Sequence, residues 1–516
     1  MKPRIHLFLF VAILTLGILA RTWEIRSLPP GLNEDEASSA VDAFSLYRYG
    51  TDRNGVSYPV YMISWGSGQN ALNAYAMIPF IAFGGLSPFT IRMPALFAGI
   101  LALPLIYLIG RRTAGKDFAL AAMFLLAISP WHILQSRWGF EGNLLPFVFA
   151  SGYLLLLKSM ENRSWLIPAM LLMGLCLYTY GPAYAAVPLF LLFGLPVLIR
   201  SGRLRPQDLL GALVVLIAVS LPIGLFLLVN RLGWDTLHLG PISVPRLPAQ
   251  PRYETIGAIF QQDAIRNLGQ NLASLASLLW EQEDGFFFNT VPPYGYFYSY
   301  TLPLAAAGAV WLFAVRPSGQ TPERKLLLAW LAACLVVGVL EPVNIGRINL
   351  IFIPLTFCIA ALLNWISTRS RIGFWLAVSA FLVAFALFSR EYHGQEYRAI
   401  ADREFSAGLL PAIDFAARQG QGAICVTRKV NMPYIYVLFS QRLDPAGYLA
   451  NVKYANPHGI FRQVSHLDRY NFGLNNCPDD EQTIYVLADE PPPQNGMRYG
   501  LSNFGHFAVY VPHRNP

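Results

Sequence analysis

The sequence predicts a polytopic α-helical membrane protein with a small soluble α/β domain at its C-terminal end. Of its 516 residues, 54% are hydrophobic and 13% are charged, whereas a soluble globular chain carries about 25% charged residues. The apolar residues gather into repeated runs, each close to the length that crosses a bilayer as a helix. From about residue 390 onward the composition becomes that of a soluble domain.

Eleven apolar segments are predicted to span the membrane. They are 5–20, 89–110, 117–133, 144–157, 165–180, 182–199, 209–230, 301–315, 326–340, 348–366 and 374–388. The first segment is not expected to be a cleaved signal peptide, because Arg21, Trp23 and Arg26 follow it where cleavage would require small residues.

Lysine and arginine indicate on which side of the membrane each loop lies. The N-terminus and alternate loops hold fifteen of these residues, whereas the short loops on the other side hold a single arginine each, Arg137 and Arg347. Since cytoplasmic loops are enriched in basic residues, we expect a cytoplasmic N-terminus and an extracytoplasmic C-terminus in the plasma membrane. A membrane domain then covers 1–389, with outer loops at 21–87 and 231–299.

The net charge of +8 does not indicate a nucleic-acid partner. Nucleic-acid-binding proteins gather their basic residues on one face or along one element. Here the basic residues are distributed among short loops between apolar segments, as the orientation rule predicts. We therefore expect membrane lipids, and no nucleic acid, around this chain.

Residues 390–516 are predicted to form an extracytoplasmic α/β domain. The expected elements are helices at 396–418 and 433–439 and strands at 423–428, 483–488 and 506–511. No dinucleotide fingerprint, P-loop or zinc-spaced cysteine and histidine set occurs in it, so no catalysis is assigned there. Cys425 and Cys477 both lie in this domain, where a disulfide between them is possible.

Three consecutive carboxylates, Glu34, Asp35 and Glu36, follow the first apolar segment. Charged groups beside a bilayer are costly unless they face water, lipid head groups or a catalytic cleft. A site for chemistry is therefore one interpretation of this cluster. The alternative is a solvated loop, or the acidic first turn of a helix at 37–49.

Further candidates on the predicted outer face are Glu141 and three arginines, Arg92, Arg137 and Arg347. A guanidinium binds phosphate through two parallel N–H groups, and Arg347 opens a span at the depth of lipid phosphates; a head-group anchor is the alternative. A carboxylate can accept the proton of an incoming hydroxyl or amine while a basic residue stabilises a departing phosphate. Together these residues indicate group transfer from a lipid-phosphate donor.

Several short motifs follow one another over the first 360 residues. They are Pro29-Pro30-Gly31, Asp35-Glu36-Ala37, Gly50 to Asp52 with Gly55 and Tyr58-Pro59, the run from Gly85 to Pro94, Ser129-Pro130 with Ser136-Arg137, and Arg347-Ile348-Asn349 followed by Pro354. Their order resembles that of the GT-C glycosyltransferases, in the branch of protein O-mannosyltransferases and lipid A aminoarabinose transferases.

This resemblance implies a GT-C-like fold and an inverting transfer of a monosaccharide from a polyprenyl-phosphate donor, at the outer membrane face, to a protein, lipid or glycan acceptor. It pairs Asp35, as the base that activates the acceptor, with Glu36. Glu141 falls at a second acidic position where relatives often have aspartate. Arg347 takes the lipid-phosphate role, and Glu34 has no assigned role.

Two further inferences concern the branch and the cofactor. No lysine occurs between Lys2 and Lys116, which departs from the aminoarabinose branch, where a lysine of the first outer loop helps to hold phosphate. No cofactor is predicted. Carboxylates such as Asp35 and Glu141 are able to ligate a divalent cation, but the resembling branch does not generally require one.

Two other classes of membrane protein are alternatives. An O-antigen ligase or polymerase would also combine many spans with a large outer loop. It would be expected to use outer-face arginine and histidine rather than an early Asp-Glu pair. A transporter would be expected to show internal repeats and charged or interrupted helices at mid-membrane, and neither feature is found.

Overall fold

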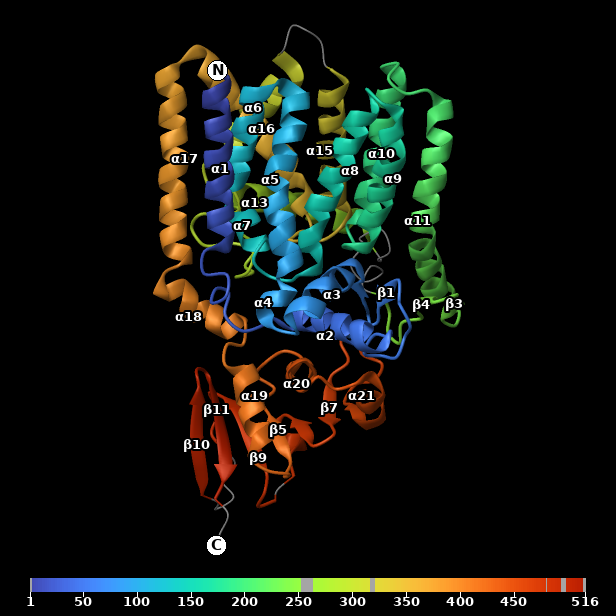
Figure 1. The fold of residues 1–516 in the computed structure, drawn as a ribbon, viewed down its shortest axis with the longest axis vertical. Coiled ribbons are helices and arrows are strands. Elements are labelled where there is room, and N and C mark those ends of the chain that lie inside the picture. The colour runs from blue at the N-terminus through green and yellow to red at the C-terminus, as the bar shows by residue number, and fades with distance from the viewer. Residues whose placement is uncertain (1, 252–262, 316–320, 479, 493–497, 514–516) are drawn as a thin grey trace. The chain divides into compact units, whose positions relative to one another are not determined.

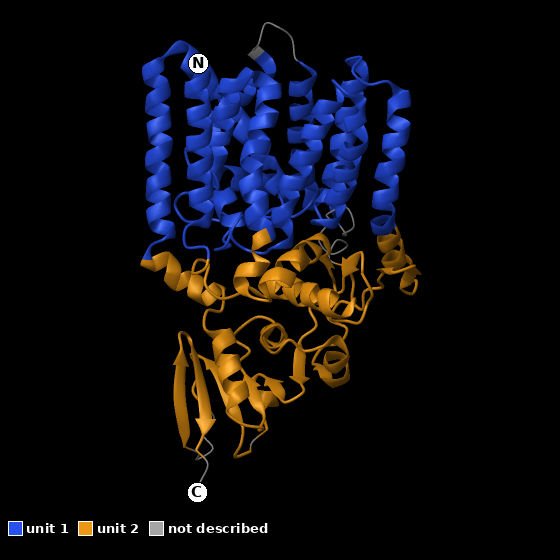
Figure 2. Ribbon diagram, viewed as in Figure 1, with its two compact units in different colours: residues 1–25, 94–224, 253–394 blue, residues 26–93, 225–252, 395–516 orange. Residues whose placement is uncertain are grey.

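The computed structural model describes residues 2–251, 263–315, 321–478, 480–492 and 498–513 (Figure 1). It divides into two compact units (Figure 2): unit 1 comprises 1–25, 94–224 and 253–394, and unit 2 comprises 26–93, 225–252 and 395–516. The boundary predicted at residue 390 lies close to the boundary at 394/395. The first outer loop, however, belongs to the same unit as the C-terminal residues.

Unit 1 is a bundle of apolar helices that run side by side (Figure 1). They are α1 (Pro3–Thr22), α5 (Met93–Ala114), α6 (Lys116–Ala127), α7 (Pro130–Gln135), α8 (Leu145–Ser159), α9 (Leu166–Leu175), α10 (Ala183–Arg200), α11 (Pro206–Leu232), α13 (Ala264–Glu281), α14 (Thr301–Val310), α15 (Pro322–Leu340), α16 (Phe352–Arg369) and α17 (Arg371–Tyr392). The last residues of α11 belong to unit 2.

Each of the eleven predicted spans contains one of these helices. Within the described ranges, seven helical stretches are long and apolar enough to cross a membrane by themselves. They are 3–22, 93–114, 141–159, 183–200, 206–232, 349–369 and 371–392. The other four predicted spans are occupied by α6, α9, α14 and α15, which are shorter or begin with charged residues.

The helices differ in how much of their apolar surface the protein itself covers. In α5, α8 and α16 most of the apolar stretch is buried, whereas α1 and α17 leave nearly all of theirs uncovered. Apolar surface of this extent is not stable in water and matches the hydrocarbon interior of a bilayer. Unit 1 is therefore an integral membrane bundle with α1 and α17 facing lipid.

Unit 2 joins the first outer loop to the C-terminal residues. Its elements from the first outer loop and from the loop after α11 are α2 (Glu34–Tyr49), β1 (Tyr61–Met62), β2 (Gln69–Asn70), α3 (Leu72–Gly84), α4 (Pro88–Ile91), β3 (Leu237–Leu239) and β4 (Ile242–Val244). Its C-terminal elements are α18 (Gln395–Glu404), α19 (Leu409–Arg418), β5 (Ile424–Val426), α20 (Pro433–Gln441), α21 (Pro445–Asn451), β6 (Val452–Tyr454), β7 (Val464–Leu467), β8 (Tyr470–Phe472), β9 (Ile484–Ala488), β10 (Tyr499–Phe504) and β11 (Phe507–Pro512).

The C-terminal strands form one seven-stranded sheet in the order β10-β11-β9-β5-β8-β7-β6. The central strand β5 is parallel to both of its neighbours, β8 and β9, and the outer strands pair antiparallel. Cys425 of β5 forms a disulfide with Cys477, with their Cα atoms 5.8 Å apart, a usual separation for a disulfide.

One hydrophobic core holds the two parts of unit 2 together. Buried residues of α2, such as Ala37 and Val41, belong to the same cluster as Ile435 and Leu438 of α20. Gly31 marks how closely the two parts approach: its φ is +57°, and a Cβ there would lie 2.2 Å from the carbonyl oxygen of Phe405. Only glycine fits this position without displacing backbone.

Two helix boundaries differ from the sequence prediction. The helix expected at 37–49 already begins at Glu34, because the Asn33 side chain and Glu36 form a capping box at its start. The single helix expected at 396–418 is divided into α18 and α19. Residues 405–408 separate the two helices, and Gly408, with φ +91°, is the residue immediately before α19. Helix α13 (Ala264–Glu281) lies in the loop expected at 231–299, and residues 252–262 before it lie outside the described ranges.

Candidate active site

Asp35 and Glu34 are the two partly exposed carboxylates of the acidic cluster, and Glu36 is buried. Asp35 lies in the first turn of α2, and its Oδ1 accepts hydrogen bonds from Trp65 Nε1 at 3.1 Å and from Gln69 Nε2 at 3.3 Å. Both donors come from the β1–β2 hairpin. Within the described part of the chain, Oδ2 accepts no hydrogen bond, so this oxygen is available to a reactant.

A buried polar network orients the amide that holds Asp35. Gln69 Oε1 accepts hydrogen bonds from the hydroxyls of Ser38 at 2.9 Å and Ser64 at 2.8 Å, which leaves Nε2 to face Asp35. Arg53 donates to Ser38 Oγ at 2.9 Å and pairs with Asp42 at 3.3 Å, both side chains being buried. These hydrogen bonds and the buried ion pair restrict the orientation of the Gln69 amide. No sequence pattern marks this network, because its members are common polar residues with no distinctive spacing.

Glu36, expected to act together with Asp35, is fully buried. Arg92 donates to both of its oxygens, from Nη2 to Oε1 at 2.5 Å and from Nε to Oε2 at 3.1 Å. The remaining bonds of Arg92 go to the carbonyl oxygens of Pro29 at 2.6 Å and Gly31 at 2.9 Å. This ion pair holds the loop before α2, so both residues are placed to position Asp35 rather than to contact a substrate.

Glu34, which the sequence analysis left without a role, contacts the C-terminal part of unit 2. Its Oε1 accepts a hydrogen bond from Asn431 Nδ2 at 2.8 Å, across 397 positions of sequence. Burial, followed by the nearby charge of Asp35, raises the pKa of Glu34 to about 7. A carboxylate with such a pKa changes its charge near neutral pH. No sequence signal pointed to Asn431.

Glu141 and Arg347 lie in neighbouring loops of unit 1. Glu141 begins a short 3-10 turn and is 6% exposed. The loop after α15, which carries Arg347, contacts this turn through Asn349. The Nδ2 atom of Asn349 donates to the carbonyl oxygen of Gly142 at 2.8 Å. The partly exposed guanidinium of Arg347 donates from Nη1 to Pro342 at 2.9 Å, and its charge also acts on the Glu341 carboxylate; within the described part of the chain its other guanidinium N–H groups make no hydrogen bond. The structure thus brings together an acid and an arginine that the sequence separates by about 200 positions.

Arg137, expected to bind lipid phosphate, is instead buried at the end of α1. Its Nη1 and Nη2 donate to the carbonyl oxygens of Arg21 at 3.1 Å and Trp23 at 2.7 Å, and its side chain is 1% exposed. The last carbonyl groups of a helix lack partners within the helix and attract cations. Arg137 therefore caps α1, and this geometry does not support the phosphate role predicted from the sequence.

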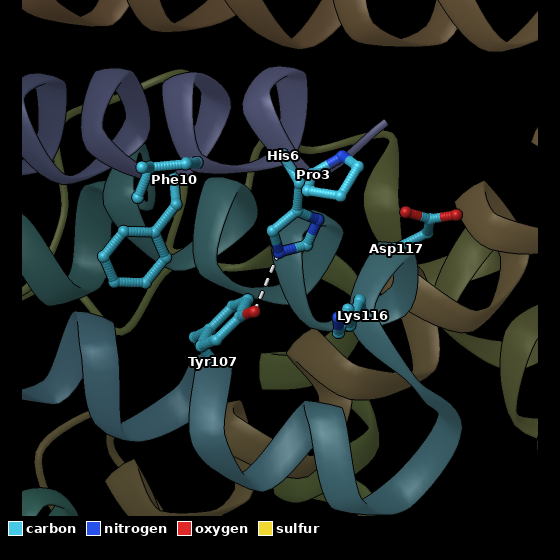
Figure 3. A pocket seen from close by; sticks show the side chains of 7 residues that line it. Pro3, His6, Phe10, Tyr107, Lys116 and Asp117 are labelled. Carbon is cyan, nitrogen blue, oxygen red and sulfur yellow. Dashed lines mark hydrogen bonds between the residues drawn. The ribbon is translucent and has the colours of Figure 1, made fainter. Parts of the chain in front are cut away.

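A cavity of about 570 Å³ lies at the other end of α1 (Figure 3). Pro3, His6 and Phe10 of α1 face Tyr107 and Lys116 across it, and His6 Nε2 lies 2.8 Å from the Tyr107 hydroxyl. A helix of 20 residues is about 30 Å long. This cavity is therefore remote from Glu141 and Arg347 and lies on the predicted cytoplasmic side.

The fold and the site together define a class of protein. It has a helical membrane bundle, a C-terminal α/β domain, and a helix, α2, that follows the first membrane helix and begins with an acidic turn. Residues 72–224 match the family of dolichyl-phosphate-mannose-protein mannosyltransferases. A stretch of 171 residues is 31% identical to YkcB of Bacillus subtilis strain 168, whose name assigns it provisionally as a mannosyltransferase. The match covers 33% of this chain and 22% of the length of that relative.

Solved structures show the same fold. ArnT from Cupriavidus metallidurans, bound to undecaprenyl phosphate, matches with a TM-score of 0.56 over 98% of this chain and 97% of that chain, at 13% identity. The oligosaccharyltransferase of Archaeoglobus fulgidus, in complex with zinc and sulfate, matches with a TM-score of 0.51 over 84% of this chain and 61% of that chain, at 14% identity. The chain has the fold of the GT-C membrane glycosyltransferases, which confirms the predicted resemblance.

Proposed function

We propose that this protein is an inverting glycosyltransferase that moves a monosaccharide from a polyprenyl-phosphate donor to an acceptor at the outer face of the plasma membrane. The acceptor is a protein, lipid or glycan with a free hydroxyl or amine. The GT-C fold and the partial match to the mannosyltransferase family support this reaction class. The undecaprenyl phosphate bound to ArnT supports a lipid-linked donor.

The observation that carries the proposal is the environment of Asp35. Two neutral N–H groups hold one of its oxygens, while the other oxygen has no protein partner in the described ranges. A fixed carboxylate with one free oxygen is suited to act as a general base. Glu36 next to it has no such oxygen, because Arg92 occupies both.

In the proposed reaction, Asp35 Oδ2 accepts the proton of the acceptor as the acceptor oxygen or nitrogen forms a bond to the anomeric carbon. The bond between that carbon and the phosphate oxygen breaks on the opposite side, so a single displacement inverts the configuration. The electron pair leaves with the polyprenyl phosphate. We assign Arg347 to stabilising this phosphate, because an arginine with unpaired N–H groups offers charge-assisted hydrogen bonds to it.

No metal step is included in this proposal. Glu36 already accepts from Arg92 on both oxygens, so Asp35 is the one carboxylate of that pair with an oxygen left to bind anything. Among the residues that the structure describes, no cluster of three or more histidine, cysteine, aspartate or glutamate side chains is arranged to hold a metal ion.

Replacing the proposed base tests the function. Purified protein is incubated with a panel of polyprenyl-phosphate monosaccharides and a cell-envelope extract, and mass spectrometry follows the sugar-bearing product and the released polyprenyl phosphate. We expect Asp35→Asn to reduce turnover at least 100-fold, in line with typical contributions of a general base. Asp235→Asn removes an exposed aspartate of the same unit and is the matched control. Turnover near the wild-type rate in the Asp35→Asn protein would remove Asp35 from the mechanism.

A further inference from the structure

The C-terminal domain contains a polar crevice that has no role so far. It has a volume of about 520 Å³ and is lined by Arg428, Lys429, Asn475, Asn476 and Glu490, together with Gly473 and Leu474. Arg428 and Lys429 follow the end of β5, residues 473–476 follow the end of β8, and Glu490 follows the end of β9. The crevice is therefore built from three loops at one edge of the sheet.

The sheet topology makes this edge a favoured place for a ligand. Strands β5, β8 and β9 are mutually parallel with β5 in the centre, so their carboxyl ends meet at the same edge. The chain leaves β5 towards β8 and then crosses back to β9 on the other side. In open α/β sheets, ligands bind outside the carboxyl ends of the strands where the connections change direction in this way.

A glycine in the crevice wall makes room for a neighbouring side chain. Gly473 has φ +84°, and a Cβ at this position would lie 2.7 Å from the Cδ atom of Arg428. The absence of a side chain allows Arg428 to lie along the crevice wall. The disulfide between Cys425 and Cys477 ties β5 to the segment after β8, so two of the three walls are covalently joined.

The side chains at the crevice retain unused hydrogen-bonding capacity. Arg428 makes one long hydrogen bond, at 3.5 Å, to the carbonyl oxygen of Val464. Within the described ranges, the side-chain amide of Asn475 has no partner. Lys429 is partly neutralised, with Nζ 2.8 Å from the carbonyl oxygen of Asp489 and 3.8 Å from Glu490. Arg428 is thus the cation best able to bind an anion here.

The same loop connects the crevice to the acidic cluster. Asn431, which holds Glu34, follows Lys429 by two residues. Two residues span about 7 Å at most. The crevice therefore lies close to the first turn of α2, which carries Asp35.

We propose that this crevice binds the acceptor of the transfer reaction as a carbohydrate that bears a phosphate or carboxylate group, with Arg428 on the anionic group and Asn475 on sugar hydroxyls. This inference rests on the proposed glycosyltransferase function. We favour a carbohydrate over an acidic peptide, because Asn475 and Asn476 offer amide groups to hydroxyls beside Arg428 and Leu474 is the one large apolar side chain lining the crevice.

Direct binding to the purified full-length protein tests this proposal without requiring transfer. The probes are glucose 1-phosphate, glucuronate, neutral glucose and a short acidic peptide, each titrated in detergent solution with saturation-transfer NMR as the readout. We expect both anionic sugars to bind at least tenfold more tightly than glucose. Arg428→Ala should weaken their binding at least tenfold, and Asn475→Ala should weaken all three sugars.

Arg418→Ala is the matched control. Arg418 is an exposed arginine at the end of α19, and it precedes the start of β5, whereas the crevice lies beyond the end of that strand. This variant should leave binding unchanged. Equal binding by the wild-type and Arg428→Ala proteins, or tighter binding of the peptide than of the sugars, would overturn the proposal. If either result were found in a protein with normal sugar transfer, the crevice assignment would be wrong and the proposed glycosyltransferase function would stand. Loss of transfer in the wild-type protein with intact sugar binding would instead contradict the proposed function.

Discussion

Three adjacent carboxylates at the start of α2 meet three different environments. Successive side chains on a helix point about 100° apart, so Glu34 reaches Asn431, Asp35 reaches Trp65 and Gln69, and Glu36 reaches Arg92. Since the three residues lie in the same helical turn and all carry a carboxyl group, their different hydrogen-bond partners distinguish their roles. Asp35 is the one with two N–H groups on one oxygen and, within the described residues, no hydrogen bond on the other.

The raised pKa of Glu34 predicts a pH dependence of transfer. Below about pH 7 Glu34 is neutral. As the pH rises through this value it ionises, and its negative charge stabilises the proton that moves towards Asp35 in the transition state. We therefore expect kcat/KM to rise between about pH 6 and 8. Glu34→Gln should remove this rise without abolishing turnover.

A second variant separates this effect from a simple loss of structure. The hydrogen bond from Asn431 lowers the pKa of Glu34, whereas the charge of Glu404 on α18 raises it. Asn431→Ala should therefore move the midpoint of the pH profile above that of the wild-type protein. A profile that is the same in all three proteins would show that Glu34 does not influence Asp35.

At the level of elements, the pair of Glu36 and Arg92 joins three pieces of chain. Arg92 follows α4, Glu36 lies in α2, and Pro29 and Gly31 form the loop before α2. The side chains of Arg92 and Glu36 are buried, so each depends on the other for its hydrogen bonds. The orientation of α2, and with it the position of Asp35, depends on this pair.

Removing one member of the pair should destabilise unit 2 strongly. Arg92→Ala leaves the Glu36 carboxylate buried without its cation, which typically costs about 3–5 kcal/mol. We expect a lower unfolding temperature, measured by differential scanning fluorimetry of the purified protein. The control is Arg246→Ala, which breaks an exposed pair with Asp235 and should leave the unfolding temperature nearly unchanged. Equal unfolding temperatures for the two variants would mean that the buried pair does not hold the loop.

At the scale of the whole molecule, the distribution of basic residues predicts the orientation in the membrane. We expect an impermeant maleimide added to intact cells to label cysteines placed at Ser57 and Gln421, in the first outer loop and the C-terminal domain. A cysteine at Ser201, in a basic loop, should be labelled only after the membrane is broken. The unpaired native cysteines, Cys176, Cys334 and Cys358, are buried, so background labelling should be low. Labelling of Ser201→Cys in intact cells would contradict the predicted orientation and indicate the opposite one.

Much of the fold follows from local properties of the sequence. The eleven apolar segments each contain a helix, because a run of apolar residues and the backbone bonds of a helix are set within one stretch of chain. The strands β5, β9 and β11 also lie near their predicted places. The break at Gly408 between α18 and α19 was not predicted, because it depends on a close approach to Phe504, far along the chain.

The candidate site was predicted in part. The acidic cluster, Glu141 and Arg347 were recognised as charged residues at predicted span boundaries. The burial of Arg92 and Arg137 was not recognised, since a free guanidinium and one that caps carbonyl groups have the same sequence signature. Trp65, Gln69 and Asn431 gave no signal, because they contribute as partners and carry no charge.

The sequence by itself determined that this chain is a helical membrane protein, predicted a GT-C-like fold, and indicated the acidic cluster at 34–36 as a candidate site. Hydrophobicity, charge and motif order are properties that can be read one stretch at a time. The tertiary structure decided which of the three carboxylates is available. That choice depends on contacts with residues 30 to 397 positions away, and only the folded chain brings Trp65, Arg92 and Asn431 to the first turn of α2.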